Sequence, residues 1–367
     1  MKKTLTGVIA FVLAAGSLPA YVQAQESPAL FVSRANARIA KSMAFKNKWD
    51  GPTSGPKMPG KAQRIILITS DMRDTSIQAL HRGLKEAASA AGWELHHMDT
   101  WSLPYKRADA FARAMALKPD GLILAGLNAK DVEKEIQSAK IPVVGWHASN
   151  KLGPTDNLFT NIGTDPKDVG QSAALLSVLE SNGKAGVVIV TNPNQLYSVA
   201  KSNEVVETIK QCQTCSVLAL EEIPLMAANE KIPLMLTNMA KQHGKRWTHT
   251  IVVNDMYIDA MTGPTSEAPL AEVKDMHTLS AGSGVESAYK RIRNQKLQFG
   301  TVPEPVNMQA WQLIDELNRA FAKEKPSLYS PPAYVVTQQN MVFNGGKANY
   351  FDPDNGYRNE YKKIWGK

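Results

Sequence analysis

The chain has 367 residues, of which 43% are hydrophobic and 21% charged, with 24 glycines and 21 prolines. This composition excludes disordered, collagen-like and disulfide-scaffold proteins, and the length suits one or two domains. The net charge of +8 is spread along the chain, without the clustered basic run and interleaved aromatics of a nucleic-acid surface. We therefore expect no nucleic-acid binding.

The amino end has the pattern of an export signal. Lysines at positions 2–3 precede an apolar run at 5–15, and a small-residue cleavage site ends at Ala24. The alternative is a membrane anchor, which would need an apolar span of about 20 residues that the sequence lacks. We predict a signal peptide over residues 1–24, cleaved after Ala24, and an exported mature chain.

Residues 25–62 are predicted to form a lead-in to the first domain. A short helix is expected over 29–44, and the proline and glycine density at 49–61 then indicates extended chain. The run at 55–62 nearly matches the phosphate-binding GxxxxGK[ST] motif, but Ala62 has no hydroxyl and the run precedes a strand. We therefore expect no nucleotide site here.

The next 230 or so residues alternate short β-rich runs with amphipathic helical stretches. A first series predicts strands at 64–69, 93–98, 121–124 and 141–144, with helices near 77–91, 108–117 and 131–139. A second series predicts strands at 185–190, 216–220, 250–253 and 278–280, with helices near 199–211, 232–242 and 285–293. Parallel sheets need helices on both faces, so the fold class is α/β with two doubly wound parallel-sheet lobes.

Cys212 and Cys215 lie between a predicted helix and a predicted strand. In an exported chain they are expected to form a short-loop disulfide. The alternative is a redox-active CxxC, but that motif should open a helix after a strand. Neither cysteine has a histidine at ligand spacing, and neighbouring His96 and His97 point to opposite sides of a strand, so we predict no metal and no cofactor.

Ligands of doubly wound sheets bind beyond the carboxyl ends of the strands, where loops and helix amino ends converge. The two rims offer many polar side chains there, including Ser70, Asp74, Thr100, Asn192, Asn194 and Tyr257, and the backbone of Gly282. From these loops we predict the following ligand-binding residues: Asp71, Arg73, Trp101, Asn128, Trp146, His147, Tyr197, Lys201, Asn254, Asp255 and Ser283.

Several of these residues also have a plain structural interpretation. Trp101 and Trp146 suit stacking on a sugar or aromatic ring but equally suit core packing. His147 suits hydrogen bonding to a ligand or to neighbouring protein groups. The glycine-rich run at 281–284 suits either anion binding at a helix end or a tight turn. The run at 352–356 resembles a calcium loop only faintly, and a turn is expected there.

Short motifs spread over residues 62–340 resemble the periplasmic solute-binding proteins of the ribose-binding type, the receptors of ABC importers. They include LKEAASAAG at 84–92, KPDGLIL at 118–124, VVND at 252–255 and TVPEP at 301–305. The resemblance implies two lobes of the type I fold, joined by three crossovers near Thr164, Glu304 and Pro332. The N-terminal lobe would comprise 63–163 and 305–332, the C-terminal lobe 164–304 and 333–345, and a tail 346–367.

The resemblance carries over only some ligand residues. Lys201 occupies the position of an arginine that binds the ligand in the ribose-type pattern, and Asn254 that of an asparagine that binds it. Glu304 aligns with a glutamine of the hinge, which adds Glu304 to the predicted site. The Asp-Arg pair after the fourth strand is replaced here by His147 and Ala148, so the resemblance implies the fold without implying ribose as the ligand.

The resemblance implies a monomeric, periplasmic, non-enzymatic receptor that captures a small polar, sugar-like ligand by hinge closure and presents it to a membrane permease. A second hypothesis is a ligand-sensing subunit for a chemoreceptor or sensor kinase. A third is an exported enzyme with His147 and Glu304 as an acid/base pair, although the sequence has no independent signal for a catalytic set.

Overall fold

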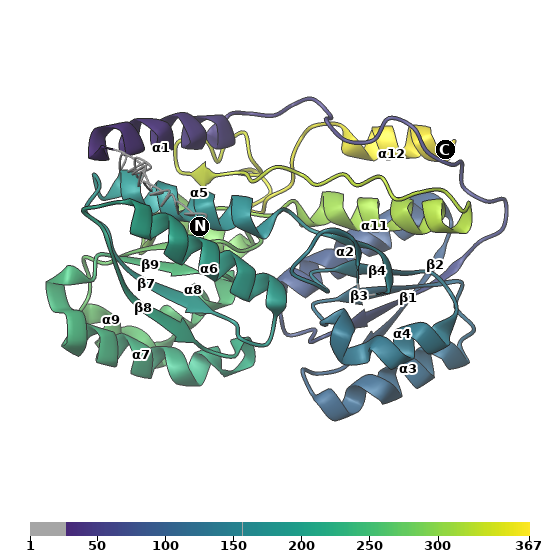
Figure 1. Ribbon diagram of the computed structural model, residues 1–367, viewed down its shortest axis with the longest axis horizontal. Coiled ribbons are helices and arrows are strands. Elements are labelled where there is room, and N and C mark those ends of the chain that lie inside the picture. Colours follow the sequence, from purple (N-terminus) through teal and green to yellow (C-terminus); the bar gives the residue numbers. More distant parts are fainter. Residues whose placement is uncertain (1–26, 156) are drawn as a thin grey trace, which may run out of the picture.

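Two six-stranded sheets, each covered by helices on both faces, form the frame of the molecule (Figure 1). The computed structural model describes residues 27–155 and 157–367, so the predicted export signal lies outside the described residues. The α/β fold class with two doubly wound lobes is confirmed. In the described part of the chain, the helices are too short or too polar to cross a membrane.

The N-terminal lobe contains the sheet β2-β1-β3-β4-β6-β5, parallel except for its edge strand β5. Its strands are β1 (Arg64–Thr69), β2 (Glu94–Asp99), β3 (Gly121–Ala125), β4 (Val143–Trp146), β5 (Gly153–Thr155) and β6 (Leu158–Ile162). Its helices are α2 (Thr75–Ala91), α3 (Arg107–Ala116), α4 (Glu133–Ala139) and α11 (Val306–Phe321). Helices α2 and α11 cover one face, and α3 and α4 cover the other.

Strand β1 shows why the sequence forms such a layer. Ile65 and Leu67 point into the core under α2 and α11, while Ile66 and Ile68 point into the core above α3 and α4. Because both faces are buried, the strand is a continuous apolar run and shows no polar alternation. Strand β7 (Gly186–Thr191) of the other lobe is likewise buried along its whole length.

The C-terminal lobe contains the sheet β12-β11-β10-β9-β7-β8, parallel except for its edge strand β12. Its strands are β7 (Gly186–Thr191), β8 (Ser216–Glu222), β9 (His249–Val252), β10 (His277–Ser280), β11 (Gln298–Thr301) and β12 (Val336–Thr337). Its helices are α5 (Pro166–Glu180), α6 (Leu196–Gln211), α7 (Ala228–His243), α8 (Asp255–Met261), α9 (Glu267–Ala271) and α10 (Glu286–Arg293). A disulfide joins Cys212 and Cys215 between α6 and β8.

Each sheet has two strands more than the four predicted from the sequence. β5 and β12 are only three and two residues long, too short to leave a periodic pattern. β6 contains the polar Asn161, and β11 begins with Gln298, so neither is a clean apolar run. The expectation of four strands per lobe was therefore wrong at the sheet edges.

The described part of the chain passes between the lobes five times. Three of these passages lie before α5 near Thr164, before α11 near Glu304, and between α11 and β12 near Pro332. The other two involve α1 (Pro28–Met43) and α12 (Tyr357–Trp365), which lie along the same side of the molecule in Figure 1.

Helix α1 belongs to the C-terminal lobe and α12 to the N-terminal lobe. Phe31, Ala35 and Ile39 of α1 are buried against α5 and its neighbours. Trp365 of α12 stacks on Trp311 of α11, with ring centroids 5.3 Å apart. The predicted lead-in and tail are thus each packed into a core.

Candidate functional site

Two hollows lie between the lobes, at the carboxyl ends of both sheets. The outer cleft has a volume of about 520 Å³ and is lined from both lobes by polar side chains, among them Ser70, Asp71, Asn128, Asp131, Asn192 and Gln195. The second, which we call the inner pocket, is a small space of about 20 Å³ that is also lined from both lobes. Asp74 lines both of them.

Direct hydrogen bonds cross the cleft. Asp74 caps the amino end of α2 and Asn254 caps that of α8. The Asn254 amide donates from Nδ2 to Asp74 Oδ1 over 3.2 Å, so the caps of two helices from opposite lobes meet. At the outer cleft, Asn128 Nδ2 donates to the carbonyl of Asn194 over 3.4 Å.

Glu304 is the centre of a fully buried hydrogen-bond network in the hinge. Its Oε2 accepts from His147 Nε2 over 2.9 Å, from the Tyr197 hydroxyl over 3.0 Å and from the Thr164 backbone N–H over 3.3 Å. Its Oε1 lies 3.6 Å from Lys201 Nζ. The carboxylate therefore ties together two hinge crossovers and both lobes.

Burial and neighbouring charges decide the ionisation of this network. Burial alone would raise the pKa of Glu304, but His147 and Lys201 outweigh it and bring the pKa to about 2. Burial lowers the pKa of His147 below its ordinary value. At neutral pH the network thus holds an ionised Glu304 that accepts from a neutral His147.

Lys201 uses its ammonium group within the protein. Its Nζ donates to the carbonyls of Val253 over 3.1 Å and Ala281 over 2.6 Å, just beyond the ends of β9 and β10. With Glu304 these acceptors match the three donors of an ammonium group. Lys201 lines the inner pocket, but its geometry is that of a residue that positions strand ends and the Glu304 carboxylate.

Three stacked rings cross the lobe boundary. Trp146 and His147 of the N-terminal lobe stack with centroids 3.8 Å apart, and His147 stacks on Tyr197 of α6 at 3.7 Å. Trp146 is the last residue of β4 and 2% exposed, and its indole N–H donates to Gln309 over 2.8 Å. The predicted loop position of Trp146 was wrong, because the strand extends two residues beyond its expected end.

The other predicted residues divide into two groups. Asp71 and Asn128 line the outer cleft, and Asn254 and Ser283 line the inner pocket. Asp255, Arg73 and Trp101 line neither hollow.

Each of these three residues has partners elsewhere. The Asp255 carboxylate accepts from the backbone N–H groups of Ser283 and Gly284, both over 3.0 Å, and so fixes their turn. Arg73 pairs with Asp71 and lies near the exposed ring of Trp101 at the rim.

Gln195 and Ser198 line the inner pocket and were missed by the sequence reasoning. Both lie at the start of α6, where Ser198 Oγ donates to Gln195 Oε1 over 3.0 Å. The helix was expected to begin at residue 199, whereas it begins at Leu196. A correct helix start would have placed both side chains at the rim.

The geometry of two facing rims agrees with the comparisons with known proteins. A family model described as periplasmic binding protein domain matches residues 65–325, well over half of the chain. The chain belongs to this family. The type I fold implied by the sequence resemblance is thereby confirmed for this periplasmic binding protein.

Solved structures share the fold of this periplasmic binding protein at low sequence identity. GanP, a glucose-galactose binding protein from Geobacillus stearothermophilus, has a TM-score of 0.66 and 15% identity, covering 77% of this chain and 99% of its own. An ABC transporter solute binding protein from Mycobacterium smegmatis with bound glycerol has a TM-score of 0.68 and 15% identity, covering 79% and 99%. A XylFII-LytSN complex has a TM-score of 0.64 and 15% identity, covering 76% and 99%. No similar protein was found among curated protein sequences.

Proposed function

We propose that this chain is the exported solute-binding receptor of an ABC importer, which captures a small polar, sugar-like molecule between its lobes. The observation that carries the proposal is the cleft itself, where carboxylate, amide and hydroxyl groups from both lobes face one another. Such groups both donate to and accept from ligand hydroxyls, so one ligand would bridge the two lobes.

Closure around the ligand would exchange direct lobe-to-lobe bonds for bonds through the ligand. The Asn254 to Asp74 bond and the Asn128 to Asn194 bond are the ones to be replaced. A ligand that binds both rims favours the closed form by its differential affinity for that form. Micromolar affinity would correspond to about 8 kcal/mol.

We assign direct ligand contacts to Asp71, Asp74, Asn128, Asn254 and Ser283, which line the hollows. Glu304, Lys201 and Tyr197 also line the inner pocket, but their buried polar atoms bond to one another and to the backbone, so we assign them the role of positioning the contact residues. His147 and Glu304 bond to each other, and we assign this pair a positioning role and no acid/base role.

The test is a thermal-shift screen of the mature chain against sugars, polyols, sugar acids and aromatic acids, because a ligand of the native state raises the melting temperature. A hit is then titrated by calorimetry into the Asn254→Ala variant, which should bind at least about 10-fold more weakly because the ligand loses its hydrogen bonds to the Asn254 amide. Asn359→Ala, on the exposed surface of α12, is the matched control and should bind normally.

Two results would contradict the proposal. One is a screen in which no sugar or polyol stabilises the protein, and the other is a ligand whose affinity is the same for Asn254→Ala as for the wild type. A sensory role would use the same cleft, and a solved complex of similar fold pairs XylFII with LytSN. Co-purification with a permease or with a sensor protein separates the two roles.

A further inference from the structure

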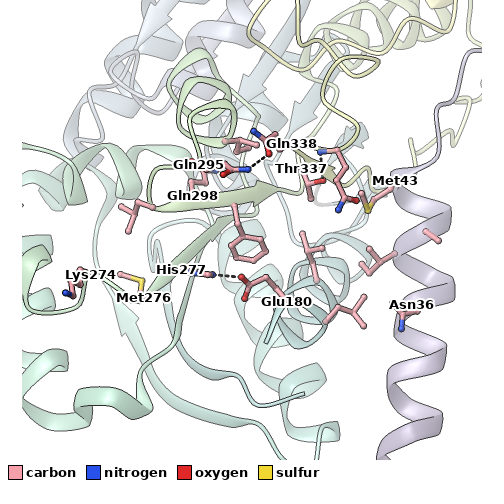
Figure 2. A pocket seen from close by; sticks show the side chains of 18 residues that line it. Asn36, Met43, Glu180, Lys274, Met276, His277, Gln295, Gln298, Thr337 and Gln338 are labelled. Carbon is pink, nitrogen blue, oxygen red and sulfur yellow. Dashed lines mark hydrogen bonds and ion pairs between the residues drawn. The ribbon is translucent and has the colours of Figure 1, made fainter. Parts of the chain in front are cut away.

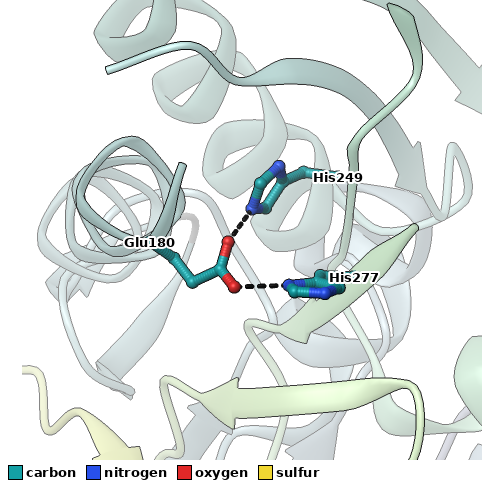
Figure 3. Close-up of side chains that lie close together, drawn as sticks. All are labelled: Glu180, His249 and His277. Carbon is teal, nitrogen blue, oxygen red and sulfur yellow. Dashed lines mark hydrogen bonds and ion pairs between the residues drawn. The ribbon is translucent and has the colours of Figure 1, made fainter. Parts of the chain in front are cut away.

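Three metal-ligating side chains converge at the end of the C-terminal sheet opposite the cleft (Figure 3). Glu180 is the last residue of α5, His249 the first of β9 and His277 the first of β10. His249 and His277 are register partners on neighbouring parallel strands, so their side chains leave the same face of the sheet. Helix α5 brings Glu180 over that face.

The donor atoms already face one another. Glu180 Oε2 lies 2.6 Å from His249 Nε2, and its other oxygen is hydrogen-bonded to His277 Nδ1. The three ligand atoms all lie within 4.8 Å of one another. A tetrahedral zinc ion with bonds of about 2.0 to 2.2 Å needs donors roughly 3.4 Å apart, so small side-chain rotations suffice.

The surroundings suit a bound cation. His249 Nδ1 bonds to Thr248 Oγ1 over 2.8 Å, the kind of outer contact that orients a metal-binding imidazole. The side chains of Glu180 and His277 are 27% and 49% exposed, which gives an ion a path from solvent. Both also line a cavity of about 760 Å³ beside α1, drawn in Figure 2, so the remaining coordination position would face open space.

We propose that Glu180, His249 and His277 form a binding site for a zinc-class divalent transition-metal ion. Two imidazoles and one carboxylate are a zinc ligand set, with water in the fourth position. Among the described residues, this is the only group of three such side chains whose ligand atoms lie close enough together, within 4.8 Å of one another, to hold one ion. The bound ion would link the end of α5 to the starts of β9 and β10.

Binding is tested by calorimetric titration of ZnCl₂ into the chelator-treated mature chain, without a histidine tag. We expect one Zn²⁺ per chain and a rise in melting temperature, and CoCl₂ should give the visible absorption of tetrahedral Co²⁺. Glu180→Gln and His277→Ala each remove one ligand and should weaken Zn²⁺ binding at least about 100-fold.

The matched control is His96→Ala, because His96 lies 3.7 Å from Glu94 on the exposed surface and belongs to no group of three ligand side chains among the described residues. This variant should bind Zn²⁺ as the wild type does. Absence of stoichiometric Zn²⁺ binding, or unchanged affinity in Glu180→Gln, would overturn the proposal. Circular dichroism without metal checks that His277→Ala is folded, and Glu180→Gln decides the question if it is not.

Discussion

The two ends of the C-terminal sheet carry clusters built from similar groups, a glutamate with histidine. At the cleft end, Glu304 is 1% exposed and is surrounded by His147, Tyr197, Lys201 and backbone donors. At the far end, the side chain of Glu180 is 27% exposed and pairs with two histidines, His249 and His277, beside a cavity. Glu304 is buried and its oxygens already have partners, so the first cluster serves to hold the lobes together. Glu180 is partly exposed beside a cavity, so the second cluster has room for an ion.

The largest expected difference between the two clusters is in how much each glutamate contributes to the free energy of unfolding. Glu304→Gln removes the charge that faces the buried Lys201, and leaving one member of a buried charge pair alone costs about 3–5 kcal/mol. Urea denaturation of the wild type and the variant measures this cost. Glu94→Gln, an exposed carboxylate in a surface pair, serves as control and should change the free energy of unfolding by less than about 0.5 kcal/mol.

Acid should remove much of the difference in the free energy of unfolding between the wild type and Glu304→Gln. The pKa of Glu304 is about 2 in the folded protein and 4.5 ordinarily, so its stabilising effect is complete above pH 4.5 and is lost as the pH falls towards 2. By pH 3 the loss amounts to about 2 kcal/mol. The gap between wild type and Glu304→Gln should narrow accordingly from pH 7 to pH 3, and a constant gap would refute the assigned pKa.

The smallest effect is expected at the far cluster without metal. Glu180→Gln should change the free energy of unfolding by less than about 1 kcal/mol, because partly exposed ion pairs contribute little. Denaturation in the presence of a chelator measures it. A loss as large as that of Glu304→Gln would mean that the two clusters do not differ in the way described above.

Most of the fold follows from the sequence because buried strands such as β1 and β7 are unbroken apolar runs followed by amphipathic helices. The edge strands β5 and β12 were not predicted, because a strand of two or three residues is too short to show an alternating pattern. The site was predicted more coarsely. The strand ends marked the right loops, but which side chain faces the cleft depends on partners distant in sequence, as the inward bonds of Lys201 and Asp255 show.

The far cluster, formed by Glu180, His249 and His277, has no recognisable motif in the sequence. Glu180, His249 and His277 are 69 and 28 residues apart along the chain, and only the parallel pairing of β9 with β10 brings the two histidines together. Metal motifs are recognisable when ligands share one helix or loop. A ligand set drawn from three separate elements becomes visible only in the folded structure.

The position of α12 also constrains how the protein is made. The N-terminal lobe needs Tyr361 and Trp365 to cover Trp311, yet these residues follow the strands of both lobes along the chain. Its hydrophobic core therefore stays incomplete until both sheets of the protein have been synthesised.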